Sequence, residues 1–268
     1  MTTTTPTAPS GSPLRWIVSD ALTVTKRNLI TYTRLPQLLV FSTIQPVMFV
    51  LLFAFVFGGA IQTQGDYVQF LIPGIMVQTV AFGSTATGVG LADDLGKGLI
   101  DRFRSLPMAR SAVLAGRTLS DSVRNLFVIL LMLGVGYAIG FRIQTNIASA
   151  ALAIVIALFF GFAFCWISAT IGMSVGNVET AQVSSFIWMF PLVFASSVFV
   201  PVETMPGWLQ VFAEHQPITL TVHALRSLLI GDAAVPGSTT GHVLGSLAWS
   251  GAILAVFMTL AVRRYRRT

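Results

Sequence analysis

Apolar positions along this chain gather in long blocks that short polar segments separate. Several uncharged blocks reach about 20 residues, which is enough for a helix to cross the hydrocarbon core of a bilayer. The pattern therefore predicts an all-α membrane protein with six transmembrane helices. The expected spans cover residues 37–59, 67–91, 119–140, 147–175, 183–200 and 243–262.

The segments outside these spans have distinct compositions. Residues 1–13 are rich in Thr, Pro and Ser, which predicts a disordered tail. Residues 14–36 keep their apolar positions on one helical stripe, which is typical of an interfacial amphipathic helix. Residues 201–240 are too polar to cross and too apolar for a free loop, so we expect short outer re-entrant or interfacial helices before the last span. The transmembrane domain then covers residues 37–262, and residues 263–268 form a basic tail.

Charged residues crowd together in one internal segment, residues 93–110, between the second and third expected spans. Within it Leu99, Phe103 and Leu106 recur at helical spacing, and most charges fall on the other side. This arrangement predicts a short amphipathic helix at the membrane surface, ended by Pro107. The alternative is a solvated loop that only orients the protein by its charge.

Two of the expected spans have faces that match lipid poorly. The second span is uncharged but carries many small and polar side chains, so one of its faces should meet protein or a cavity. The fifth span has aromatic residues around Pro191, for which ordinary helix packing is the alternative explanation. The candidate substrate path from these two spans consists of Gln78, Thr79, Phe82, Phe186, Trp188, Met189 and Phe190.

Composition and charge set the class of protein and its orientation. With 54% hydrophobic and 10% charged residues in 268, no sizeable soluble domain fits beside the spans. The net charge of +6 does not indicate nucleic-acid binding, because Lys and Arg sit at span ends. Of the 16 Lys and Arg residues, all but Arg142 and Arg226 fall on the side of the N-terminus. Both termini and the segment 93–110 are therefore expected in the cytoplasm.

The sequence lacks the common signatures of nucleotide and metal sites. Lys97 stands between two glycines without the rest of a phosphate-binding loop, so the chain is not expected to bind ATP by that route. His215, His223 and His242 share no metal-ligand spacing, and no metal site is expected. No catalytic motif is present, which argues against an enzyme.

Ionisable residues are expected to be absent from the cores of all six spans. An ion-coupled carrier would place such groups near the middle of the bilayer, so a stand-alone carrier is disfavoured. Asp121 and Arg124, at the start of the third span, are spaced i, i+3 and are expected to pair near the interface. A six-span protein without an energy source of its own needs a partner that drives it.

Several segments of the sequence are similar to those of a known family. Through these segments the chain resembles the permease subunits of ABC-2-type exporters, and most closely the daunorubicin/doxorubicin-resistance permease group of actinobacteria. Gln216 is a departure, since the family usually has Asn before this proline. The matching segments are residues 57–60 (FGGA), 70–74 (FLIPG), 97–108 (KGLIDRFRSLPM) with Arg110, 201–209 (PVETMPGWL), 216–217 (QP) and 224–226 (ALR).

This resemblance implies a function, a set of partners and a location. The chain would be the permease of an exporter in the cell membrane that moves a hydrophobic or amphipathic drug-like compound outward. The alternative is export of a cell-envelope lipid or glycan precursor by the same machinery. The implied assembly is a homodimer, or a heterodimer with a sister permease, bound to two copies of an ABC ATPase. ATP and magnesium would be held by that ATPase, and this chain would contact lipid and no nucleic acid.

The resemblance also gives the charged segment a role. In this family the cytoplasmic helix after the second span acts as the coupling helix, which sits in a cleft of the ATPase. Arginine side chains offer several donors in one plane, which suits contact with carboxylates or carbonyl groups. The implied ATPase contacts are Lys97, Asp101, Arg102, Phe103, Arg104, Ser105, Leu106, Pro107 and Arg110.

Overall fold

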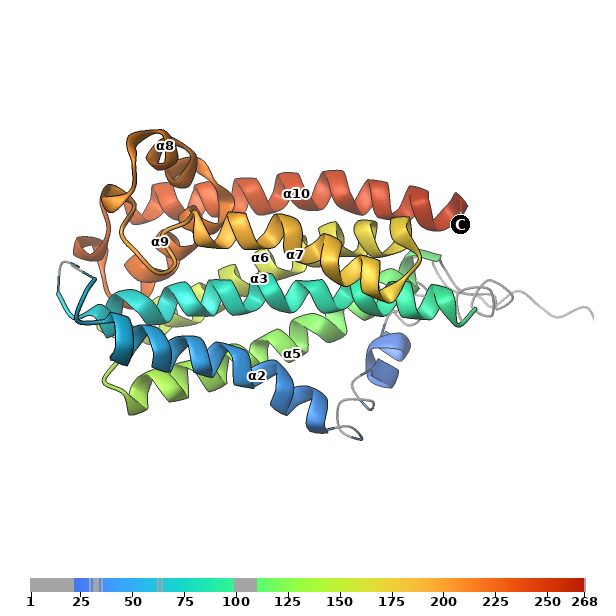
Figure 1. Ribbon diagram of the computed structural model, residues 1–268, viewed down its shortest axis with the longest axis horizontal. Coiled ribbons are helices and arrows are strands. Elements are labelled where there is room, and N and C mark those ends of the chain that lie inside the picture. Colours follow the sequence, from blue (N-terminus) through green and yellow to red (C-terminus); the bar gives the residue numbers. More distant parts are fainter. Residues whose placement is uncertain are drawn as a thin grey trace, which may run out of the picture.

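The computed structural model confirms the predicted all-α class (Figure 1). It describes residues 22–28, 30, 34, 36–61, 63, 65–98 and 110–267, and within these ranges the chain forms helices and turns without a β-strand. The longer helices are α2 (Pro36–Leu51), α3 (Tyr67–Gly96), α5 (Arg110–Ala138), α6 (Ile147–Val175), α7 (Val178–Phe194) and α10 (Thr239–Arg267). The shorter elements are the π-helix η1 (Leu52–Phe57), α8 (Gly207–His215), α9 (Pro217–Leu229) and the 3-10 turns η2 (Val202–Thr204) and η3 (Asp232–Ala234).

Each expected span overlaps an apolar helix, although these helices differ in length. In the described part of the chain, 4 helices are long and apolar enough to cross a membrane. They are Tyr67–Gly96, Leu114–Ala138, Ile147–Val175 and Thr239–Arg264. Two apolar helices, Ser42–Phe57 and Val178–Phe194, are shorter.

The bounds of α6 match the expected span because both ends carry specific capping residues. The Asn146 side chain accepts a hydrogen bond from the Ser149 backbone amide at 2.7 Å, which satisfies a free donor of the first turn. Gly176 ends the helix with a φ of 63°, in the left-handed region that glycine adopts readily. These two residues bracket the apolar run, so α6 begins and ends where the sequence predicts.

The bounds of α5 and α7 differ from the prediction. Helix α5 begins at Arg110 rather than at residue 119, since the hydroxyls of its first turns bond to backbone carbonyls and leave the helix intact. Helix α7 ends at Phe194, and residues 195–200 form a turn instead of completing the span. In this turn the Ala195 carbonyl accepts a hydrogen bond from the Gln216 side chain, and the Ser197 amide donates to the Thr219 hydroxyl of α9. These contacts stabilise the turn against continuation of the helix.

Helix α3 lies at the centre of the bundle and contacts α2, α5, α6, α7 and α9 (Figure 1). It begins at Asp66, whose carboxylate accepts from the Val68 backbone amide. Near its other end α3 crosses α6 with the two backbones in contact, because glycines stand on both sides. A Cβ atom at Gly172 would lie 2.1 Å from the Gly88 carbonyl oxygen. Only residues without a side chain allow this close approach.

The two short helices expected before the last span are present as α8 and α9, and their environments differ. Helix α8 lies at the edge of the bundle, where Trp208 is 77% exposed. Helix α9 is buried along most of its length against α3, α6 and α10. The segment 201–240 therefore adds a buried helix to the bundle in addition to a surface helix.

The N-terminal segment contacts the beginning of α5. Residues 22–28 are helical, and the Thr25 hydroxyl donates to the Gly116 carbonyl at 3.0 Å. The Asn28 amide donates to the Ser120 hydroxyl at 3.3 Å. The expected tail, residues 1–13, lies outside the described residues.

Candidate functional site

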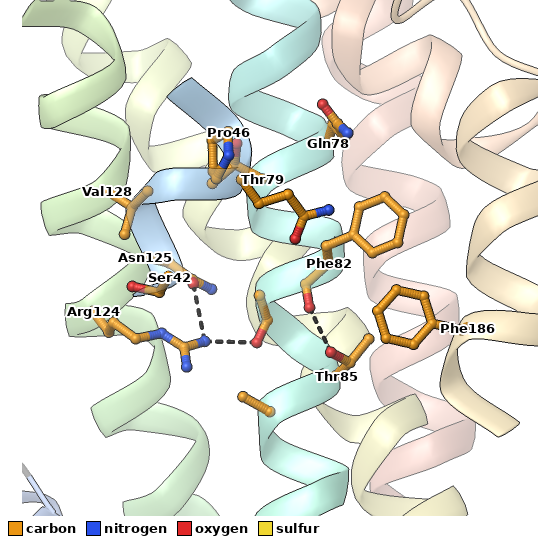
Figure 2. A pocket seen from close by; sticks show the side chains of 13 residues that line it. Ser42, Pro46, Gln78, Thr79, Phe82, Thr85, Arg124, Asn125, Val128 and Phe186 are labelled. Atoms are coloured by element: carbon orange, nitrogen blue, oxygen red, sulfur yellow. Dashed lines mark hydrogen bonds between the residues drawn. The ribbon is translucent and has the colours of Figure 1, made fainter. Parts of the chain in front are cut away.

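A cavity of about 160 Å³ opens between α2, α3, α5 and α7 (Figure 2). Its residues on α3 fall near the middle of the helix, so the cavity lies within the apolar part of the bundle. The lining consists of Ser42, Gln45, Pro46, Gln78, Thr79, Phe82, Gly83, Thr85, Ala86, Arg124, Asn125, Val128 and Phe186.

The structure brings part of the predicted substrate path together at this cavity. Gln78, Thr79, Phe82 and Phe186 line it directly. Phe190 lies beside it, with its ring 6.0 Å from the ring of Phe82.

The two other predicted path residues are not among those that line the cavity. The Trp188 ring lies 5.7 Å from the Phe164 ring of α6, and Met189 is fully buried in the core. For these two residues the arrangement is ordinary helix packing, which the sequence left open as the alternative. The aromatic cluster of α7 is therefore divided between the core and the cavity.

Aromatic rings form one wall of the cavity. The rings of Phe82 and Phe186 are 5.7 Å apart, and Figure 2 shows both on the same side of the space. Pro46 and Val128 stand on the opposite side. An apolar ligand placed here would contact hydrophobic surface on two sides.

Three polar side chains at the cavity leave a buried atom without a hydrogen bond. Gln78 Oε1, Thr79 Oγ1 and Asn125 Nδ2 have no hydrogen-bond partner among the described residues. Gln78 and Asn125 are each only 2% exposed. A buried polar atom left unpaired costs on the order of 1–3 kcal/mol, so such atoms are uncommon away from functional sites. All three side chains belong to residues that line the cavity.

A charged pair lies at the end of the cavity nearer to the α3 C-terminus. An Arg124 guanidinium nitrogen is 3.7 Å from Asp121 Oδ1, and another donates to the Gly83 carbonyl at 2.6 Å. Asp121 Oδ2 accepts from the Thr87 hydroxyl at 2.5 Å. The predicted pair is present, and both side chains are buried.

The sequence places this pair in the first turns of the third span, and its expected position near the membrane interface stays a prediction. In the structure Arg124 contacts Gly83 near the middle of α3, so the pair lies inside the bundle. The paired and hydrogen-bonded state of both groups is typical of charges within a membrane bundle.

The structure describes the flanks of the predicted coupling segment. Lys97 follows the end of α3 and forms an exposed ion pair with Asp93 at 2.6 Å. Arg117 pairs with Asp94 at 2.6 Å and joins the end of α3 to the beginning of α5. Arg110 begins α5. The other predicted contacts, Asp101, Arg102, Phe103, Arg104, Ser105, Leu106 and Pro107, lie outside the described residues.

A buried arginine organises the opposite end of the bundle. Arg226 of α9 is fully buried, and its Nε donates to the Phe70 carbonyl of α3 at 2.9 Å. Its terminal nitrogens donate to the Ser197 hydroxyl and carbonyl at 2.5 and 2.6 Å. The guanidinium also lies 3.4 Å from the centre of the Phe70 ring. One side chain therefore joins α3, α9 and the turn after α7, a role that its place in an apolar helix could have indicated.

These features define a class of protein. Long apolar helices, buried ionisable groups that are paired, and a polar cavity at mid-helix depth are typical of a multi-pass membrane permease. The chain belongs to the ABC-2 type transporter family, whose model matches residues 20–230. Within this family it is a permease similar to those of the daunorubicin and doxorubicin resistance group. ABC-2 permeases lack an ATP site of their own and work with an ABC ATPase subunit.

Two relatives match the chain over most of its length. The daunorubicin resistance ABC transporter permease protein DrrB1 of Streptomyces coeruleorubidus is 35% identical over 250 residues, which cover 93% of this chain and 87% of the relative. A probable doxorubicin resistance ABC transporter permease protein DrrC of Mycobacterium tuberculosis is 26% identical over 260 residues, with 96% and 92% covered.

The probable multidrug ABC transporter permease YbhR of Escherichia coli is more distant. It is 22% identical over 174 residues, which cover 63% of this chain and 46% of the relative.

Proposed function

We propose that this chain is the membrane subunit of an exporter that moves a hydrophobic or amphipathic drug-like compound out of the cell. The energy comes from ATP that a separate ABC ATPase binds with Mg²⁺ and hydrolyses. The observation that carries the proposal is the cavity between α2, α3, α5 and α7, which joins an aromatic wall to unpaired polar groups. The names of the relatives, which include daunorubicin and doxorubicin resistance proteins, support this kind of cargo.

The proposed assembly holds two permease chains, either identical or sister copies, and two ATPase subunits. In each permease six helices cross the membrane, with both termini in the cytoplasm. The bias of Lys and Arg toward one side supports this orientation. The arrangement of the helices agrees with it, since the C-terminal end of α10 and the end of α3 lie at the same end of the bundle (Figure 1).

In this proposal residues 97–110 receive force from the ATPase. Helix α3, which forms one wall of the cavity, leads directly into this segment, and α5 follows it. The ion pair between Arg117 and Asp94 holds the two flanks together. Movement of the segment would therefore reach both α3 and α5, which line the cavity.

A double substitution in the coupling segment tests the route from ATPase to permease. Arg102→Ala with Arg104→Ala is expected to abolish the stimulation of ATP hydrolysis by daunorubicin in the purified complex, because it removes the planar donors proposed to contact the ATPase. Arg266→Ala with Arg267→Ala, in the basic tail, is the matched control and should keep this stimulation. Full stimulation and intact assembly in the first variant would refute the coupling assignment.

A second double substitution tests the path through the cavity. Phe82→Ala with Phe186→Ala removes the aromatic wall and should raise the half-saturating daunorubicin concentration for efflux roughly 5- to 10-fold. Phe55 and Phe127 are exposed on the apolar surface, and replacing both by Ala is the control. Efflux is measured as ATP-dependent drug uptake into inverted vesicles. Equal efflux in the two variants would place the path elsewhere, and movement of a lipid-linked sugar but not the drug would favour the alternative cargo.

A further inference from the structure

A histidine stands next to the contacts that Arg226 makes. We call its bonds to the Phe70 carbonyl and to the Ser197 hydroxyl and carbonyl the Arg226 clamp. His223 lies one turn before Arg226 on α9, a helix outside the six expected spans, and its Nε2 is 3.1 Å from the Ser197 hydroxyl oxygen. One hydroxyl therefore contacts both the guanidinium and the imidazole. Figure 1 shows α9 at the end of the bundle opposite to the C-terminus.

The hydrogen bonds around Ser197 define the protonation state of His223. Arg226 only donates, so the Ser197 hydroxyl oxygen accepts from it at 2.5 Å. The single proton of this hydroxyl then has His223 Nε2 as the one acceptor that the described residues offer. His223 accepts at Nε2 only as a neutral ring with its proton on Nδ1. In the closed clamp His223 is therefore uncharged.

The groups that face His223 would not stabilise a positive charge on it. Arg226 on the same helix is itself a cation, and the ring of His242, at the beginning of α10, lies 5.1 Å from the His223 ring. From the other neighbouring elements, Tyr67 of α3 and Glu203 of η2 lie close enough to act on the charge of Arg226. Tyr67 is uncharged near neutral pH, and Glu203 is exposed to solvent.

His223 binds a proton less readily in the closed clamp than in water. Burial, followed by the positive charge of Arg226, lowers the pKa of His223 from 6.5 to about 3. A ring released into water regains its ordinary pKa of 6.5. At any pH between these two values the released ring holds a proton more often than the clamped ring. The clamp therefore keeps its stability above pH 6.5 and loses it progressively as the pH falls from 6.5 toward 3.

We propose that His223 is an acid-sensitive switch, which opens the Arg226 clamp when it takes up a proton from the side opposite to the coupling segment. The His223 side chain is partly exposed, so a proton from solution can reach it. Protonated Nε2 donates instead of accepting, so the Ser197 hydroxyl loses its acceptor and two cations lie side by side. The contacts between α3, α9 and the turn after α7 then separate. Only the outward position of this end of the bundle is taken from the proposed function.

Hydrogen exchange in the turn after α7 measures how often the clamp opens. The Ser197 amide donates to the Thr219 hydroxyl of α9 at 3.1 Å, so it exchanges with solvent when the turn and the helix separate. The full permease–ATPase complex in lipid nanodiscs is exchanged at pH 8 and at pH 5, and peptides that cover residues 195–200 are analysed by mass spectrometry. Dividing the rate of the same unstructured peptide at the same pH by each measured rate gives the protection factor.

The protection factor of the wild type should fall on the order of 30-fold from pH 8 to pH 5. At pH 5 a released ring with a pKa of 6.5 holds a proton about 30 times as often as it lacks one, and this ratio shifts the clamp toward the open state. Peptides from the middle of α6 should keep their protection, which would show that the bundle as a whole does not unfold.

Replacing His223 with glutamine should remove this pH dependence. The amide oxygen of glutamine can accept from the Ser197 hydroxyl as the neutral ring does, but the side chain does not titrate. In His223→Gln the protection factor should be the same at pH 5 and pH 8, and its agreement with the wild type at pH 8 would show that the clamp is intact. His215→Gln, at an exposed histidine of α8, is the control and should keep the fall.

Equal protection of the wild type at pH 8 and pH 5, or an undiminished fall in His223→Gln, would overturn the inference. His242→Gln should keep most of the fall, and its complete loss there would assign the response to the wrong ring and overturn the inference as well. Hydrogen exchange requires no transport. A missing pH response with intact ATP-dependent efflux would leave the proposed function standing, whereas absence of efflux with the pH response intact would contradict the proposed function alone.

Discussion

Replacing Gly172 with alanine is expected to lower the free energy of unfolding by about 1–3 kcal/mol, the usual cost of overpacking a close contact. The new methyl group would lie 2.1 Å from the Gly88 carbonyl oxygen and 2.7 Å from its carbon. These are backbone atoms, which cannot turn aside as a flexible side chain does. Helices α3 and α6 would have to separate at this crossing, and the contacts around it would be lost.

Gly134 provides the matched control for this substitution. It lies within α5, and a Cβ atom there would have no neighbouring heavy atom within 4 Å. Gly134→Ala should therefore be neutral or slightly stabilising, since alanine is the better helix former by about 1 kcal/mol. Thermal and denaturant unfolding of the purified permease in detergent would measure both variants. Equal stability of the two would show that the α3–α6 crossing is not close-packed.

Replacing Arg226 with methionine is expected to cost about 2–4 kcal/mol of stability, because the substitution leaves several buried carbonyl and hydroxyl groups without a donor. The Phe70 and Ser197 carbonyls would both lose a bond to the guanidinium. Arg226→Lys keeps the charge but cannot reach all three acceptors from one planar group, so its stability should be intermediate. The contacts that join α3, α9 and the turn after α7 would loosen in both variants.

Arg142 is the control for the Arg226 variants. Its side chain is exposed in the turn between α5 and α6 and donates to carbonyls of its own segment, those of Tyr137 and Phe141. Arg142→Met should cost less than about 0.5 kcal/mol, as exposed substitutions usually do. Unfolding curves recorded at equal protein and detergent concentration would give the loss of stability in each variant. A loss at Arg226 no larger than that at Arg142 would refute the structural role of the buried guanidinium.

The sequence predicts helix bounds well where local residues end the helix and poorly where distant residues do. Asn146 and Gly176 act on their own segment, so the bounds of α6 could be predicted. The end of α7 could not, because the sequence from Val193 to Val200 stays uncharged while the turn depends on Gln216 and Thr219 of another helix. Hydrophobic patterns do not contain such tertiary contacts.

The sequence predicted only part of the candidate cavity, because the rest of it also depends on tertiary contacts. The polar face of the second span indicated Gln78, Thr79 and Phe82, since lipid cannot satisfy such a face. Arg124 and Asn125 were missed because the sequence offers Asp121 as a local partner for Arg124 and does not show which face of α5 packs against α3.

The length of α3 connects the two ends of the permease in a simple mechanical way. Its 30 residues form a rod of about 45 Å. The rod packs against α6 at several levels, at Val80, Ser84 and Gly88. Phe70, near its first turn, is held by Arg226, and residues of the cavity wall lie between Phe70 and Gly96. If the ATPase acts at the Gly96 end as proposed, a push there would move the rod as one body, so that the cavity would change shape and the Arg226 contacts would be loaded in a single event.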